Sequence, residues 1–251
     1  MQTSWDERSK TYPRYGEKFI MQDKQTIISW CEENGVKFDG EILSVGAGSG
    51  VLEILIAKKY QSKITAVDIS EKMLEILKID AKTQGVEEKI LTVKSDWNDF
   101  KSDKKFNMTI ACMSPAISSE DDFEKLINFS SNLVIHVGWA SSKENAFLSK
   151  LLSKFELSCS LSDPARSCLR TQQIYEILER KGIKYQSKIF DGGWEEIMSE
   201  DEAYEYAKSA LLREDLSIDD KHIKSVIDEF SQNGVVTVVT KAKKGIVLFS
   251  L

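Results

Sequence analysis

The stretch from Glu41 to Glu53, EILSVGAGSGVLE, constrains the fold more than any other part of the chain. An apolar run that reads as a strand leads directly into Gly46, Gly48 and Gly50, and a helical pattern follows. Glycine has no Cβ, so a ligand can approach the main chain here while the helix directs its free N–H groups at the same place. The pattern predicts a turn that holds a nucleotide-like ligand. A tight turn without a ligand is the alternative.

Two acidic residues end the next apolar runs. Residues 63–68 read as a buried strand that ends in Asp68, which lies 22 residues after Gly46. At that distance a carboxylate can accept both hydroxyls of a ribose. Asp96 follows a third apolar run, 90–93. Because the carboxyl ends of parallel strands share one edge of a sheet, these acids favour an adenosine ligand beside the glycines.

The ligand could be a nicotinamide dinucleotide or S-adenosylmethionine. A dinucleotide fingerprint has Gly or Ala at its sixth position, where this chain has Val51, and the branched side chain disfavours a pyrophosphate. From this point the chain resembles class I S-adenosylmethionine-dependent methyltransferases. Residues 45–50 resemble the first motif of that family, 67–70 the second and 95–97 the third. The resemblance covers about residues 40–140 and says little about the methyl acceptor.

The resemblance implies S-adenosyl-L-methionine as cofactor and S-adenosyl-L-homocysteine as product. It implies that Asp68 accepts the ribose hydroxyls and that Asp96 accepts from the adenine amino group. It also implies that Ile69 lies on one face of the adenine, with Trp97 beside the ring. The full set of residues expected to bind the cofactor is Gly46, Ala47, Gly48, Asp68, Ile69, Asp96, Trp97 and Met113. Solvent-exposed acids at strand ends are the alternative for the two aspartates.

The acceptor side carries a weaker signal. Family members that methylate amino groups of DNA bases or of glutamine commonly have Asn-Pro-Pro-Tyr or Asp-Pro-Pro-Tyr after the fourth strand, where this chain has Ser114 and Pro115. This departure disfavours those substrates, so we expect a small-molecule acceptor. The two alternatives are a protein that binds the cofactor without catalysis and a nicotinamide-dependent oxidoreductase.

No catalytic residue is evident, and His136 and Tyr15 are weak candidates. His136 could act as a general base, but the alternation around it also fits a hydrogen-bonded histidine in the core. Arginines could hold a carboxylate or a phosphate, although surface arginines are common. The weak candidates for substrate contact are Tyr12, Arg14, Trp139, Arg166, Arg170 and Trp194.

Apolar runs alternate with helical patterns through the middle of the chain, which indicates βαβ units. We expect an α/β, Rossmann-like, doubly wound, mostly parallel seven-stranded sheet with an antiparallel strand near the C-terminus. The expected strands lie near 41–46, 63–68, 89–94, 106–113, 132–138 and 183–190, with closing strands at 235–239 and 245–251.

We expect one domain, 1–251, with an N-terminal arm, 1–22, and a helical insertion, 191–233, as possible lids over the cofactor edge. The alternatives are an arm anchored by its aromatic residues and an insertion that only adds stability.

Composition and sequence patterns argue against several other kinds of partner and binding site. The net charge of −6 gives no broad basic field, so we expect no nucleic-acid partner. No apolar run is long enough for a membrane span and the N-terminus lacks the pattern of a signal peptide, so we expect a cytoplasmic protein without a membrane partner. The four cysteines form no C-x-x-C pair and are read as free thiols, and we expect no metal site. The sequence leaves the oligomeric state open.

Overall fold

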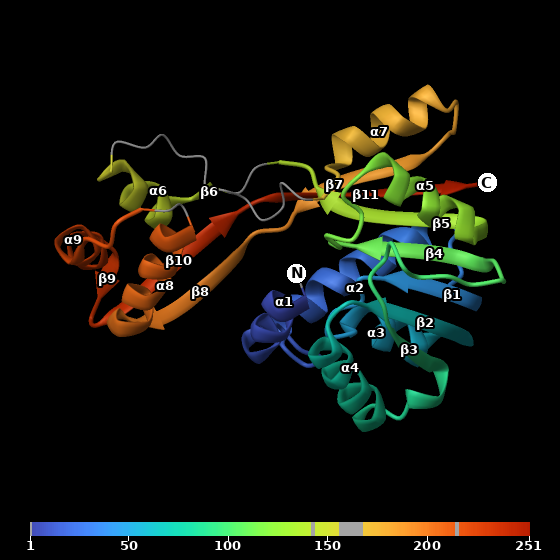
Figure 1. Cartoon of the computed structure of the whole chain (residues 1–251), viewed down its shortest axis with the longest axis horizontal. Coiled ribbons are helices and arrows are strands. Elements are labelled where there is room, and N and C mark those ends of the chain that lie inside the picture. The colour runs from blue at the N-terminus through green and yellow to red at the C-terminus, as the bar shows by residue number, and fades with distance from the viewer. Residues whose placement is uncertain (1, 142–143, 156–167, 214–215) are drawn as a thin grey trace. The chain divides into compact units, whose positions relative to one another are not determined.

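The computed structural model describes residues 2–141, 144–155, 168–213 and 216–251. Backbone contacts divide the chain into two compact units. The first unit comprises residues 1–139, 167–189 and 245–251, and the second comprises 140–166 and 190–244. Each unit has its own sheet (Figure 1). The predicted site residues that precede residue 139 all lie in the first unit.

A seven-stranded sheet forms the centre of the first unit, in the order β3-β2-β1-β4-β5-β11-β7. The strands are β1 (Gly40–Val45), β2 (Ser62–Asp68), β3 (Ile90–Lys94), β4 (Phe106–Cys112), β5 (Ser130–Trp139), β7 (Gln186–Asp191) and β11 (Lys243–Ser250). Strands β1 to β5 pair in parallel, and β11 runs opposite to β5 (Figure 1). The predicted doubly wound, mostly parallel sheet with one antiparallel strand near the C-terminus is confirmed.

Helices cover both faces of this sheet. They are α1 (Gln2–Arg8), α2 (Lys18–Glu33), α3 (Val51–Lys59), α4 (Glu71–Thr83), α5 (Glu120–Phe129) and α7 (Thr171–Arg180), with short 3-10 turns η1 (Ser9–Thr11) and η2 (Glu87–Lys89). Serine side chains cap two of these helices: the Ser70 side chain accepts from Met73 N–H, and Ser119 forms a capping box with Asp122. These caps fix the N-terminal ends of α4 and α5 beside the carboxyl ends of the parallel strands.

The second unit combines a small sheet with three helices. Its strands pair in the order β6-β10-β8, and β9 also pairs with β10. The elements are β6 (Glu144–Asn145), α6 (Ala146–Ser153), β8 (Trp194–Ser199), α8 (Glu200–Arg213), α9 (Asp220–Phe230), β9 (Ser231–Gln232) and β10 (Val235–Lys241). Its core is apolar and includes Phe147, Leu151, Ala207, Leu211, Ile223, Val226, Val236 and Val238.

The second unit corrects two expectations. The strand predicted at 235–239 does not close the large sheet, because β10 pairs with β8 in the second sheet and only β11 joins the first. Side chains of β10 alternate between exposed and buried, which suits a strand with one face on helices and one face open. The unit also reaches beyond the predicted insertion, 191–233, since it takes in 140–166 and β10. Whether the arm and the insertion act as lids stays a prediction.

Candidate active site

The glycine turn after β1 has the conformation that its sequence predicts. Gly46 has φ +69° and Gly48 has φ +58°, a region that favours glycine. A Cβ on Gly46 would lie 1.9 Å from Ser114 Oγ, so no larger residue fits there. A Cβ on Gly48 would have the Tyr12 side chain as its nearest neighbour, 3.5 Å away, which is ordinary van der Waals contact. Tyr12 therefore borders the space beside Gly48.

Asp68, the last residue of β2, ties the glycine turn to the start of α4. Its carboxylate accepts the Gly48 N–H at 2.8 Å with one oxygen and the Ser70 N–H at 2.8 Å with the other. Burial raises the pKa of Asp68, and these backbone hydrogen bonds oppose the shift. A carboxylate offers about four acceptor positions, so Asp68 can still accept the two hydroxyls of a ribose.

A cavity of about 120 Å³ opens beside Asp68 within the first unit. Seven of the eight residues predicted to bind the cofactor line it: Gly46, Gly48, Asp68, Ile69, Asp96, Trp97 and Met113. The eighth, Ala47, does not line the cavity and bonds within the turn, where its N–H donates to Val67 O at 3.1 Å. The structure thus brings together residues from three separate sequence motifs, as the spacing predicts.

Asp96 and Trp97 form the wall of the cavity after β3. Asp96 accepts the Asn98 N–H at 2.9 Å, which closes a tight turn. Trp97 is 3% exposed and its indole N–H donates to Asp122 O at 3.2 Å. Its ring stacks on Phe100 with the ring centres 5.7 Å apart. The position of the indole is therefore fixed by packing and by a hydrogen bond.

Met113 begins the loop after β4 in an unusual conformation. Its φ is +55°, a region that residues with a Cβ rarely adopt, and its N–H donates to Val137 O at 2.8 Å. Such strain is often found at ligand sites. The loop continues along the cavity with residues that sequence reasoning did not assign to the cofactor: Ser114, Pro115, Ala116 and Ser118.

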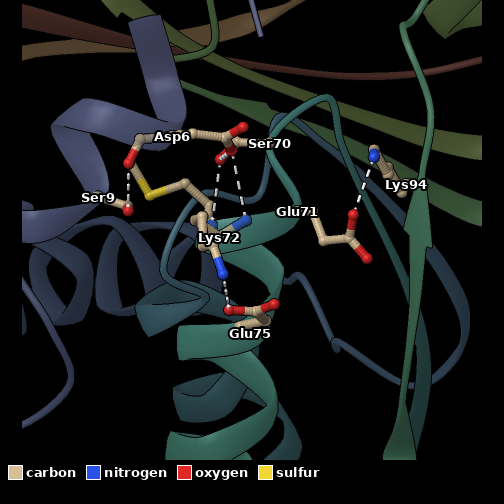
Figure 2. A network of polar contacts seen from close by, with 8 residues as sticks. Asp6, Ser9, Ser70, Glu71, Lys72, Glu75 and Lys94 are labelled. Atoms are coloured by element: carbon tan, nitrogen blue, oxygen red, sulfur yellow. Dashed lines mark hydrogen bonds and ion pairs between the residues drawn. The ribbon is translucent and has the colours of Figure 1, made fainter. Parts of the chain in front are cut away.

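The N-terminal arm is attached to the rim of this cavity. Asp6 accepts the Ser70 hydroxyl at 2.6 Å and also contacts the Lys72 N–H at the start of α4 (Figure 2). The bond to Ser70 lowers the pKa of Asp6. Two aromatic residues of the arm, Trp5 and Tyr12, line the cavity. These two residues thus bring the arm to the cavity, and its closure over a cofactor stays a prediction.

Two further contacts hold the arm to the glycine turn and to α4. The Ser49 hydroxyl donates to Pro13 O at 2.7 Å. Arg14 donates to Asp80 at 2.5 and 3.3 Å, so this candidate for substrate contact is paired with α4. Sequence reasoning missed Asp6 and Ser49, because a contact between distant segments leaves no periodic signal.

The structure does not bring the two catalytic candidates to the cavity. His136 is 2% exposed, its Nδ1 has no hydrogen-bond partner among the described residues, and burial lowers its pKa to about 4. Its ring packs edge-on against Phe123, which supports the interpretation as a core histidine. Tyr15 lies under the Lys58 ammonium, 5.4 Å from the ring centre, and does not line the cavity.

The other acceptor candidates are scattered. Trp139 ends β5, and Arg170 precedes α7, where its N–H donates to Gln173 at 2.9 Å. Trp194 belongs to the second unit, where its indole donates to Glu196 at 3.1 Å. Arg166 lies outside the described residues. Neither Trp139 nor Arg170 lines the cavity beside Asp68.

Two features of the described residues bear on other functions. No group of three or more His, Cys, Asp or Glu side chains is placed to hold a metal ion within the described part of the chain. Among the helices of the described residues, none has the length and apolar character needed to cross a membrane.

Comparisons with known proteins agree with this geometry. Residues 42–134 match a family model described as a methyltransferase domain. A comparison with curated protein sequences finds no significant match. Among solved structures, the chain is similar to magnesium protoporphyrin IX methyltransferase from Synechocystis PCC 6803 with bound S-adenosylhomocysteine, at 13% identity, TM-score 0.53, and coverage of 96% of this chain and 94% of that chain.

A second similar structure is a SAM-dependent methyltransferase from Thiobacillus denitrificans, in complex with S-adenosyl-L-homocysteine. It is 14% identical with a TM-score of 0.50, and the match covers 94% of this chain and 95% of that chain. At these identities the two structures establish the fold of this chain.

Proposed function

We propose that this chain, whose residues 42–134 form a methyltransferase domain on a class I S-adenosylmethionine-dependent methyltransferase fold, transfers a methyl group to a small-molecule acceptor. The arrangement around Asp68 is the main support for this proposal. Its carboxylate lies at the end of β2, bonds to the glycine turn, and keeps free acceptor positions toward a cavity that Asp96 and Trp97 also line. These are the groups that an adenosine ligand requires.

The residues of the cavity suit the parts of such a cofactor. Gly48 allows a ligand close approach to the main chain, and Asp68 can accept ribose hydroxyls. Asp96 can accept from an adenine amino group while Trp97 supplies a fixed apolar wall. When bound, S-adenosylmethionine supplies an activated methyl group on a sulfonium.

The remaining task of the protein is alignment of the acceptor and exclusion of water. Trp5 and Tyr12 reach the cavity from the arm and can shield it. The buried, neutral His136 is not placed to remove a proton from an acceptor there. We therefore favour an acceptor atom that is nucleophilic without a protein base, such as a thiol that ionises unaided.

A transfer assay tests this function. The purified protein is incubated with S-adenosylmethionine labelled in its methyl group and with panels of small thiols, amines, phenols and carboxylates, and labelled product is measured. We expect transfer to one panel, and Asp68→Ala is expected to abolish it. Tight cofactor binding without transfer to any panel would favour a binding protein instead. Binding of NADH in place of the cofactor would favour an oxidoreductase.

A further inference from the structure

A second cavity, which we call the amino-edge groove, lies at the other edge of the seven-stranded sheet. It has a volume of about 900 Å³ and is formed within the first unit. Its lining comes from the loop before β1, the first residues of β4 and β5, the last residues of β11 and the segment that leads into β7. Because β1 to β5 run in parallel, this is the amino edge of the sheet, whereas Asp68 lies at the carboxyl edge. The proposed methyl transfer therefore does not use this groove.

The groove is elongated, because the elements that line it follow one another across the sheet in the order β1, β4, β5, β11 and β7. Neighbouring strands lie about 4.8 Å apart, so the four steps between these strands span about 19 Å. An extended peptide rises about 3.3 Å per residue, and about six residues cover the same length. The dimensions therefore suit a short extended chain better than a compact small molecule.

Carboxamide side chains along the groove have polar atoms that can bond a ligand. The Asn132 side chain makes no hydrogen bond within the described ranges of the chain. Asn107 accepts the Glu41 N–H at 2.9 Å with its oxygen, which leaves its NH₂ group as a donor. Asn34 donates to Trp30 O at 2.8 Å, which leaves its oxygen as an acceptor. A carboxamide donates and accepts as a peptide group does, so these side chains suit the main chain of a peptide.

A lysine lies near each end of the groove. Lys37 precedes β1 and Lys184 precedes β7, both are exposed, and neither has an acidic partner in the part of the chain that the structure describes. Beside Lys184, the Tyr185 ring stacks on Tyr175 with the ring centres 5.1 Å apart, which fixes this wall. One acidic side chain, Asp39, lines the groove. Two lysines separated by the length of the groove favour a chain with a negative charge toward each end.

We propose that the amino-edge groove binds an extended acidic peptide segment of about six residues, which belongs to a partner protein. Acidic side chains of this segment pair with Lys37 and Lys184, and its main chain bonds to Asn107 and Asn132. The groove lies at the opposite edge of the sheet from the cavity beside Asp68. Peptide and cofactor therefore do not compete for the same residues.

A peptide array supplies the probe for the test. The purified chain is applied to hexapeptides that carry glutamate at both ends and differ in the four residues between them. Fluorescence anisotropy then measures the affinity of the strongest binder. We expect the same peptide with lysine at both ends to bind at least about 10-fold more weakly. A peptide with two residues between the glutamates is also expected to bind more weakly, because it is too short to reach both lysines.

Substitutions in the groove test each contact with this hexapeptide. Lys37→Gln and Lys184→Gln are each expected to weaken binding about two- to fivefold, since each removes one exposed ion pair. The two fold-changes multiply in the double variant, because the lysines lie too far apart to interact. Asn132→Ala is expected to weaken binding about 2- to 10-fold through a lost hydrogen bond. The matched control is Lys82→Gln, an exposed change of the same charge on α4, which leaves the affinity unchanged.

Three results would overturn the proposal. The first is an array without any peptide whose binding depends on its glutamates. The second is a loss of affinity in Lys82→Gln equal to that in the groove variants, because it indicates attraction by net charge alone. The third is binding of a labelled hexathymidylate as tight as that of the peptide, which indicates a nucleic-acid site. All the substituted side chains are exposed, so the variants are expected to fold and to bind S-adenosylhomocysteine as wild type does.

Discussion

When the pH falls from 7 to 5, the titration of His136 is expected to lower the free energy of unfolding of wild type by about 2 kcal/mol. Replacement of His136 by leucine is expected to remove this part of the loss. His136 lies in β5, is 2% exposed, and has an Nδ1 atom without a partner among the described residues. Burial lowers its pKa from 6.5 to about 4. The folded protein therefore holds this imidazole neutral at pH values where the unfolded chain protonates it.

The sign and the size follow from this difference. Well above pH 6.5 both states are neutral at this site, and stability is at its full value. As the pH falls below 6.5, the unfolded state gains a proton that the folded state gains only near pH 4, so stability decreases. The slope approaches about 1.4 kcal/mol per pH unit, which gives a loss of about 2 kcal/mol at pH 5.

Urea unfolding followed by circular dichroism at pH 7 and pH 5 measures this loss. Other groups titrate in the same range, so the quantity of interest is the difference between wild type and His136→Leu. The matched control is His222→Gln, which removes the second histidine of the chain, whose side chain is 41% exposed. A His136→Leu variant with the full wild-type loss would refute the assignment of His136 as a neutral core residue.

Three further predictions concern the turn, the arm and a thiol. Gly50→Ala is expected to lower the free energy of unfolding, measured in urea, by about 2 to 4 kcal/mol, because the φ of Gly50 is +77° and a Cβ there would lie 2.2 Å from Leu77 Cγ. Gly48→Ala is expected to lower it by about 1 kcal/mol and to weaken cofactor binding. Equal losses of stability in the two variants would contradict this account. Asp6→Ala is expected to speed proteolytic cleavage of the arm, whereas Glu7→Ala, which removes only the pair with Lys10, is not; equal rates would argue against the contact with Ser70. Burial raises the pKa of the Cys31 thiol to about 12. Mass spectrometry after alkylation at pH 8 is therefore expected to find Cys31 unmodified in the folded protein. Alkylation of Cys31 as fast as that of Cys112 would contradict its burial.

The first unit was predictable because its signals are local. The parallel strands are largely apolar runs, β2 ends at the acidic residue Asp68, and the caps at Ser70 and Ser119 use residues close in sequence. The positive φ angles in the turn follow from the glycines themselves. Local patterns of this kind also located seven of the eight expected residues at one cavity.

The parts that sequence reasoning missed depend on contacts between distant segments. The strand at 235–241 has an alternating pattern that fits either sheet, and only its pairing with β8 decides between them. His136 lies at a strand end near the functional edge, but packing against Phe123 places it in the core.

Binding of S-adenosylhomocysteine to wild type and to Asp68→Asn and Asp68→Ala, measured by calorimetry, tests the central claim most directly. Wild type is expected to bind one equivalent. Both variants are expected to bind at least about 10-fold more weakly, since the charged acceptor for the ribose hydroxyls is lost. Absence of binding to wild type, or equal affinity in all three proteins, would contradict the assignment of this cavity as the cofactor site.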